Sequence, residues 1–210
     1  MKMKKKIYNF LATLFLAIPN LGFVNSIKVF FIYKFFYKNN IKSIKIKKLK
    51  YRFYFKSINS LLRFYNHDYF IFFKVKPNLF IDVGATVGEE TLRLNSIYDS
   101  PNIIAIEPNS ESFKLLNRNT KKYSNITCHK IAIHNKNNNV KIAKFTEDLQ
   151  SVRINNSNII NYDEEIIDSM TFNNFIKLNN FKNIDLVKIN INGGEKYIFE
   201  EQNDIWIANT

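Results

Sequence analysis

The chain has 210 residues, of which 46% are hydrophobic, and a formal net charge of +13. This length predicts one domain, or one domain with an N-terminal extension, and the apolar content permits a sizeable core. Its single cysteine, Cys128, excludes an intramolecular disulfide, and no Cys/His cluster has zinc spacing, so we expect no structural metal. Residues 1–76 contain 17 Lys and Arg against one acid, whereas residues 77–210 contain 14 against 17. The basic character therefore belongs to the N-terminal part, where it predicts an anionic surface as partner.

Residues 1–40 form a basic, aromatic-rich segment that we expect to be a helical extension. The apolar run 7–24 is broken by Pro19 and Gly22, well short of the ~20 clean residues of a membrane span. A signal peptide is an alternative, but no small-x-small cleavage site follows the run. The aromatic run 29–37 lies among lysines, which indicates short helices in a membrane interface. A helical lid packed on the domain is an equally open interpretation.

Residues 41–77 lead into the main domain. Lysine alternates with isoleucine over 41–50, and aromatic alternates with basic over 51–56, which predicts a small hairpin of two strands. Basic residues between aromatic ones are also typical of single-stranded RNA binding. A strand with one solvated and one packed face is the better account of the pattern, and we do not expect a nucleic-acid partner. Residues 57–69 have the apolar spacing and the capping residues of a helix.

Over residues 78–210, strands alternate with helices, which predicts an α/β domain with a parallel, doubly wound sheet. The polar stretch 146–168 is expected to be irregular. The expected strands are 78–83, 102–107, 126–131, 140–145 and 184–189, and the expected helices are 88–97, one that begins at Ser110, and 171–178.

The turn after the strand 78–83 is the strongest indication of a ligand site. It has glycines at 84 and 88 but no middle glycine, and it follows an acid, Asp82, which suits the cationic S-adenosylmethionine better than a dinucleotide. The next strand ends in Glu107, in the position that receives a ribose diol. A turn carboxylate and a surface charge are the plain alternatives, but acids at two successive strand ends favour a cofactor. The predicted cofactor-binding residues are Asp82, Gly84, Ala85, Thr86, Gly88 and Glu107.

Three blocks of sequence carry a family resemblance. They are Phe80-Ile-Asp-Val-Gly-Ala-Thr-Val-Gly88, Ala105-Ile-Glu-Pro-Asn109 followed by Phe113-Lys-Leu-Leu-Asn117, and Ile184-Asp-Leu-Val-Lys-Ile-Asn-Ile-Asn-Gly-Gly-Glu195. In this order they resemble the FkbM-type S-adenosylmethionine-dependent methyltransferases, over roughly residues 45–210. The resemblance implies a Rossmann-like class I methyltransferase fold, S-adenosyl-L-methionine as cofactor, and O-methylation of a hydroxyl on a sugar, glycan or other small molecule.

This chain departs from the family pattern at two positions near the end of the third block. The family carries acids where this chain has Asn190 and Asn192, and an amide can orient a hydroxyl but cannot act as its base. Lys188 and Glu195 match charged family positions, so Asn190, Glu195 and Lys188 are the candidate catalytic residues. Glu195 is equally explained as a helix first-turn acid.

The family's domain normally has further strands after this point, which implies a domain incomplete at its C-terminus and impaired activity. Two alternatives to an active enzyme follow: a non-catalytic remnant that keeps the cofactor cleft, and a membrane-surface binding module that uses residues 1–56. The expected location is the cytoplasm, with peripheral attachment to the inner face of the membrane as an option.

Overall fold

The computed structural model describes residues 42–45, 52–55, 76–99, 101–135, 137–144, 153–154, 163–192, 194–199, 206–207 and 210. The chain divides into two compact units, residues 1–72 and 73–210, each described here by itself. The predictions for residues 1–40 and for a helix at 57–69 lie outside the described residues. In the part of the chain that is described, no helix has the length and apolar character needed to cross a membrane.

In the first unit, β1 (Lys42–Lys45) pairs with β2 (Arg52–Phe55) in antiparallel register. Phe53 and Phe55 are buried and their rings lie 6.2 Å apart, whereas Arg52 is exposed. This alternation of packed and solvated side chains is the pattern of a half-buried strand, and the predicted hairpin is confirmed.

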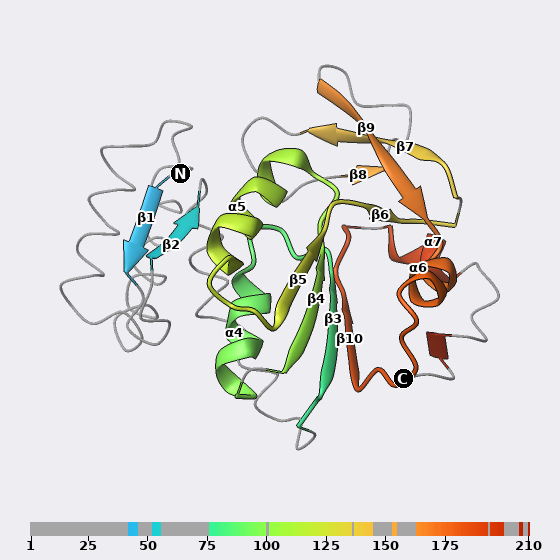
Figure 1. Cartoon of the computed structure of the whole chain (residues 1–210). Helices are drawn as coiled ribbons and strands as arrows, with labels where there is room; N and C mark the ends of the chain where they lie inside the picture. Colours follow the sequence, from blue (N-terminus) through green and yellow to red (C-terminus); the bar gives the residue numbers. More distant parts are fainter. Residues whose placement is uncertain are drawn as a thin grey trace, which may run out of the picture. The chain divides into compact units, whose positions relative to one another are not determined.

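The second unit is built on a parallel sheet with the strand order β10-β3-β4-β5 (Figure 1). Every neighbouring pair in it is parallel. The central strands β3 and β4 are mostly apolar, as expected of strands that helices cover on both faces. The strands are β3 (Leu79–Val83), β4 (Asn102–Ile106), β5 (Ile126–His129) and β10 (Leu186–Ile189).

Helices lie on both sides of this sheet, α4 and α5 on one side and α6 and α7 on the other (Figure 1). On the α6 side, Ile81 and Val83 pack in one core cluster with Phe175. On the α5 side, Ala105 packs with Leu116. The predicted doubly wound, Rossmann-like α/β fold is therefore confirmed. The helices are α4 (Glu89–Ile97), α5 (Ser110–Thr120), α6 (Phe172–Leu178) and α7 (Glu195–Phe199).

Side-chain caps fix the starts of two helices. The side chain of Asn109 accepts hydrogen bonds from the backbone N–H groups of Glu111 and Ser112, and α5 begins directly after it. The hydroxyl of Thr171 accepts one from the N–H of Asn174, at the start of α6. These caps satisfy N–H groups that lack a partner within the helix, which explains why both helices begin close to the predicted residues.

A second sheet has the order β6-β9-β7-β8, in which β6 and β9 are parallel and the other pairs are antiparallel. The expectation of irregular structure over 146–168 is wrong for two segments, because β8 and most of β9 fall within it. The strand expected at 126–131 is also too long: β5 ends at His129 and the chain then enters the second sheet. The strands are β6 (Ala132–Ile133), β7 (Asn139–Lys144), β8 (Arg153–Ile154) and β9 (Asp163–Met170).

Candidate functional site

A pocket opens at the C-terminal edge of the parallel sheet, where an open α/β sheet binds its ligands. Its walls come from the segments that follow β3, β4, β5 and β10, together with β6 and one residue of β7. Most of the lining is apolar. The described lining residues are Val83, Gly84, Thr86, Ile106, Glu107, Pro108, Ile131, Ala132, Ile133, Ile142, Asn190, Ile191 and Asn192.

Gly84 forms the sharp turn that ends β3. Its φ is +81°, a left-handed conformation that favours glycine. A β-carbon at this position would lie 2.1 Å from the carbonyl oxygen of Asn190, so the end of β10 packs directly on the bare α-carbon. The N–H groups of Gly84 and Ala85 both donate to the carbonyl oxygen of Ile106, at 2.9 and 3.0 Å, which ties the turn to β4.

Thr86 and Gly88 complete the loop, and both have positive φ, at 49° and 91°. A β-carbon on Gly88 would lie 2.9 Å from Cδ1 of Leu116, so the second glycine permits close packing of the loop on α5. The hydroxyl of Thr86 donates to Glu89 Oε2 at 2.6 Å. A left-handed threonine is strained, and this bond helps to hold it in place.

Glu107 is the buried acid of the pocket, with 3% of its surface exposed. Its Oε2 accepts the backbone N–H of Thr86 at 2.9 Å, and its Oε1 accepts that of Asn109 at 2.8 Å. Burial raises the pKa of this carboxyl to about 8, although the two N–H groups oppose the shift. The alternative of a surface charge before a proline is therefore wrong.

Asp82 lies behind the loop rather than in the pocket. It is fully buried, and Lys188 Nζ lies 2.8 Å from its Oδ1, while the hydroxyl of Thr91 donates to its Oδ2 at 2.6 Å. The same ammonium lies 2.9 Å from Glu90 Oε2 and donates to the carbonyl oxygen of Gly84 at 3.0 Å. Two acids, one cation and one hydroxyl thus form a buried cluster between β3, β10 and α4.

The charges in this cluster depend on one another. Burial raises the pKa of the Asp82 carboxyl, and the adjacent Lys188 opposes that shift. Burial would lower the pKa of Lys188, but the carboxylates of Asp82 and Glu90 outweigh it, and its pKa is raised. The two carboxylates therefore stabilise the charged form of Lys188.

The structure separates the predicted site residues into two groups. Gly84, Thr86, Glu107 and Asn190 line the pocket together. The others are absent from its described lining, and direct contact between them and a ligand stays a prediction. These others are Asp82, Ala85, Gly88, Lys188 and Glu195.

Glu195 has a local partner, since its Oε1 accepts the backbone N–H of Ile191 at 2.8 Å. This bond stabilises the turn that leads into α7 and agrees with the interpretation of Glu195 as a first-turn acid. A catalytic role for Glu195 stays a prediction.

Sequence reasoning missed several residues of the site. Asn192 was expected only as a replaced acid, yet it lines the pocket and has a positive φ of 54°. Glu90 and Thr91 were not singled out, although an acid and a hydroxyl in the first turn after the glycine loop were a possible signal. The apolar wall from Ile133 and Ile142 had no sequence signal, because it requires the second sheet.

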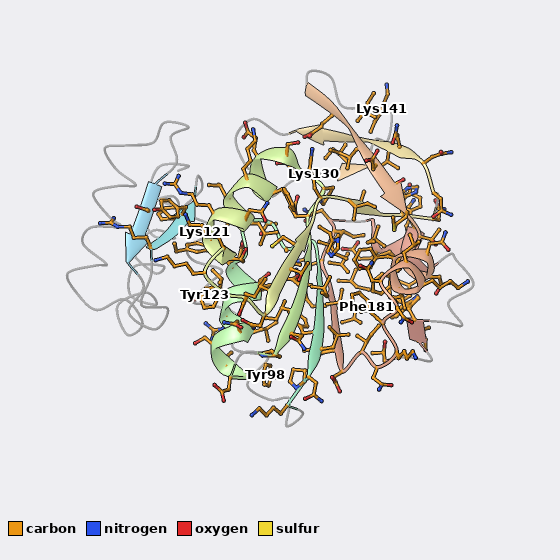
Figure 2. The ribbon with its side chains drawn as sticks, viewed as in Figure 1. Tyr98, Lys121, Tyr123, Lys130, Lys141 and Phe181 are labelled. Atoms are coloured by element: carbon orange, nitrogen blue, oxygen red, sulfur yellow. The ribbon has the colours of Figure 1, made fainter. Side chains whose placement is uncertain are left out.

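The second sheet is joined to α5 beside this pocket. Both Ser110 N–H, at 3.4 Å, and the Ser110 hydroxyl donate to the carboxylate of Glu165 in β9. Lys130, which is labelled in Figure 2, directly follows β5. It pairs with the same carboxylate at 3.5 Å. These contacts fix the sheet that supplies Ile133 and Ile142 to the pocket wall.

Among the described residues, no three His, Cys, Asp or Glu side chains gather into a group that could hold a metal ion.

Comparison with known proteins places the chain in a family. No curated protein matches the sequence. A search of solved structures found the crystal structure of methyltransferase FkbM from Methylobacillus flagellatus KT, at 16% identity and a TM-score of 0.45, over 66% of this chain and 32% of that one. The chain thus spans about a third of that protein's length. The family model described as methyltransferase FkbM domain matches residues 82–208. Because this match covers more than half of the chain, the protein belongs to the family of methyltransferase FkbM domains.

Proposed function

We propose that this chain binds S-adenosyl-L-methionine at the C-terminal edge of its parallel sheet and transfers the methyl group to a hydroxyl of a sugar, glycan or other small molecule. One observation carries the proposal. The buried acid Glu107 lines the same pocket as the loop residues Gly84 and Thr86, and the amide residues Asn190 and Asn192 lie on another wall of it.

The residues of the pocket fit the cofactor. A carboxyl group keeps acceptor positions beyond two hydrogen bonds and also donates when it holds a proton, so Glu107 retains capacity for a ribose diol beyond its two backbone bonds. The apolar side chains of Ile131 and Ala132 suit the faces of a purine ring. The bound cofactor supplies an activated methyl group, and the task of the protein is to align the acceptor and exclude water.

Asn190 and Asn192 are the polar residues that the end of β10 contributes to the pocket. Their amides can both donate and accept hydrogen bonds, which suits the orientation of an acceptor hydroxyl. Among the described lining residues the only carboxylate is Glu107, and its oxygens hold the cofactor loop. We therefore expect the acceptor to lose its proton to solvent, and we expect slow turnover.

The same observation favours a second candidate function, cofactor binding without turnover. An amide cannot take a proton from a hydroxyl at neutral pH. A chain with no base on the acceptor side of its pocket would still bind the cofactor, but it would transfer the methyl group slowly or not at all.

Calorimetric titration with S-adenosylhomocysteine tests cofactor binding. We expect the full chain to bind, and Glu107→Ala to weaken binding by about 1–3 kcal/mol, the cost of leaving buried hydrogen-bond partners unsatisfied. Glu111→Ala, which removes an exposed acid from the same βα unit, is the matched control and should bind as the parent does. Equal affinities of the Glu107→Ala variant and the parent would exclude Glu107 as a cofactor ligand.

Turnover separates the two candidate functions. The full chain is incubated with S-adenosylmethionine that carries a labelled methyl group and with a panel of sugars and glycans. Label in any acceptor supports the enzyme. Binding of S-adenosylhomocysteine with no transfer to any member of the panel supports the binding module instead.

A further inference from the structure

The side chain of Lys188 joins three parts of the domain. It begins on β10, and its Nζ contacts Asp82 of β3, Glu90 of α4 and the carbonyl oxygen of Gly84, all within 3.0 Å. Only 10% of the side chain is exposed. One buried ammonium thus holds the sheet, the helix and the loop between them.

The bond to Gly84 fixes the orientation of a peptide unit. The Gly84 carbonyl accepts from Lys188, while the N–H on the other side of the same peptide, that of Ala85, donates to the carbonyl of Ile106 at 3.0 Å. The peptide is therefore held at both ends. Thr86 follows immediately and lines the pocket, so the orientation of this peptide determines where Thr86 lies.

Charge neutralisation alone does not explain this arrangement. The ammonium of Lys188 has three N–H donors: Asp82 and Glu90 lie within reach of two of them, and the third is directed at the Gly84 carbonyl. Thr91 already supplies Asp82 with a hydrogen bond, at 2.6 Å. The contact with Gly84 is the one that reaches the pocket loop.

We propose that Lys188 is a positioning residue, which acts through the Gly84 carbonyl to hold the loop Gly84–Gly88 in its binding conformation and to couple that loop to the end of β10 that carries Asn190. This role deepens the proposed function, since the loop serves the cofactor only if that function holds. The raised pKa of Lys188 agrees with a fixed ammonium rather than a base.

Amide hydrogen exchange on the unliganded full chain tests the role without any ligand. We expect Lys188→Met to speed exchange about tenfold or more at the amides of Gly84, Ala85 and Thr86, the scale of a lost charged hydrogen bond. The amides of α5, such as Leu116, should change far less. Lys177→Met, which removes an exposed lysine from α6, is the matched control and should leave the loop as it is.

A second variant covers the case in which Lys188→Met fails to fold, because that substitution leaves two buried acids without a cation. The triple variant Lys188→Met, Asp82→Asn, Glu90→Gln removes all three charges. Fast loop exchange in a cooperatively melting triple variant supports the positioning role. Loop exchange equal to that of the parent would show that Lys188 only neutralises its neighbours, and would overturn the proposal.

S-adenosylhomocysteine titration of the same proteins distinguishes a failure of the proposed function from a failure of the positioning role of Lys188. If the parent binds, the triple variant should bind about tenfold or more weakly. A parent that does not bind contradicts the proposed function, whereas the exchange experiment still decides whether Lys188 holds the loop.

Discussion

The carbonyl oxygen of Asn190 lies 2.1 Å from the point where a β-carbon on Gly84 would stand. The loop after β3 and the end of β10 therefore pack backbone against backbone. In the proposed site the two segments bind different ligands: the loop binds the cofactor, and the end of β10 orients the acceptor. Their close approach leaves no room for a side chain between them.

Gly84→Ala should destabilise the fold by about 2–4 kcal/mol, because alanine is strained at positive φ and its methyl group would collide with backbone rather than with a flexible side chain. Urea denaturation measures the change. Gly194→Ala is the matched control: its β-carbon would meet mainly the side chain of Ile191, at 3.0 Å, which can shift. Equal stability of the two variants would contradict the backbone contact.

Thr91→Val should cost about 1.5–3 kcal/mol of stability, since it removes the hydroxyl that donates to the buried carboxylate of Asp82 while keeping the shape of the side chain. Thermal or urea unfolding measures the loss. Thr120→Val provides the comparison, because the Thr120 hydroxyl bonds to the neutral carbonyl of Leu116 and should cost about 1 kcal/mol. If Thr91→Val were as stable as the parent, Asp82 would not depend on that hydroxyl.

The stability of the chain should fall as pH rises from about 4.5 to about 8. Glu107 has an ordinary pKa of 4.5 that burial raises to about 8, so within this window the folded state holds a proton that the unfolded state has lost. The contribution is complete at the acid end and disappears as pH passes through 8. The raised pKa of Asp82 acts in the same direction.

Urea unfolding at several pH values between 5 and 8 measures this slope. Glu107→Gln cannot titrate and should show a shallower pH dependence than the parent. Glu111→Gln, at an exposed position, should keep the parental slope. A Glu107→Gln variant with the full parental slope would assign the pH dependence to other groups.

Residues 1–56 should bind the full chain to anionic membranes. Residues 1–76 hold 17 Lys and Arg against one acid, and the leading lysines flank apolar and aromatic runs. We expect co-sedimentation with vesicles that contain phosphatidylglycerol, weaker binding at high salt, and little binding to pure phosphatidylcholine. Binding that is indifferent to anionic lipid, or that survives deletion of residues 1–40, would contradict an electrostatic attachment.

Local patterns in the sequence were sufficient for much of the fold. β3, β4 and β10 lie in a sheet that is covered on both faces, so most of their residues are apolar. Such a strand can be recognised from its own sequence, without knowledge of the strands that pair with it. The starts of α5 and α6 were also predictable, since Asn109 and Thr171 cap them within a few residues. The positions of Gly84 and Glu107 at successive strand ends followed from the same patterns.

Pairing between segments that are far apart in the sequence determined the second sheet and the contacts of Lys188. β9 was missed because Asp163–Met170 carries few apolar residues and its two isoleucines are adjacent, so the sequence shows no alternation of apolar and polar residues. In the sheet the two isoleucines point to opposite faces, since Ile167 is buried whereas Ile166 is 66% exposed. It is a strand because β7 and β6 pair with it. The contact between Lys188 and Asp82 spans 106 residues and depends on the parallel register of β10 on β3. Because a shift of one residue would turn Lys188 to the opposite face of the sheet, only the tertiary structure could show that this lysine contacts Asp82, Glu90 and the Gly84 carbonyl.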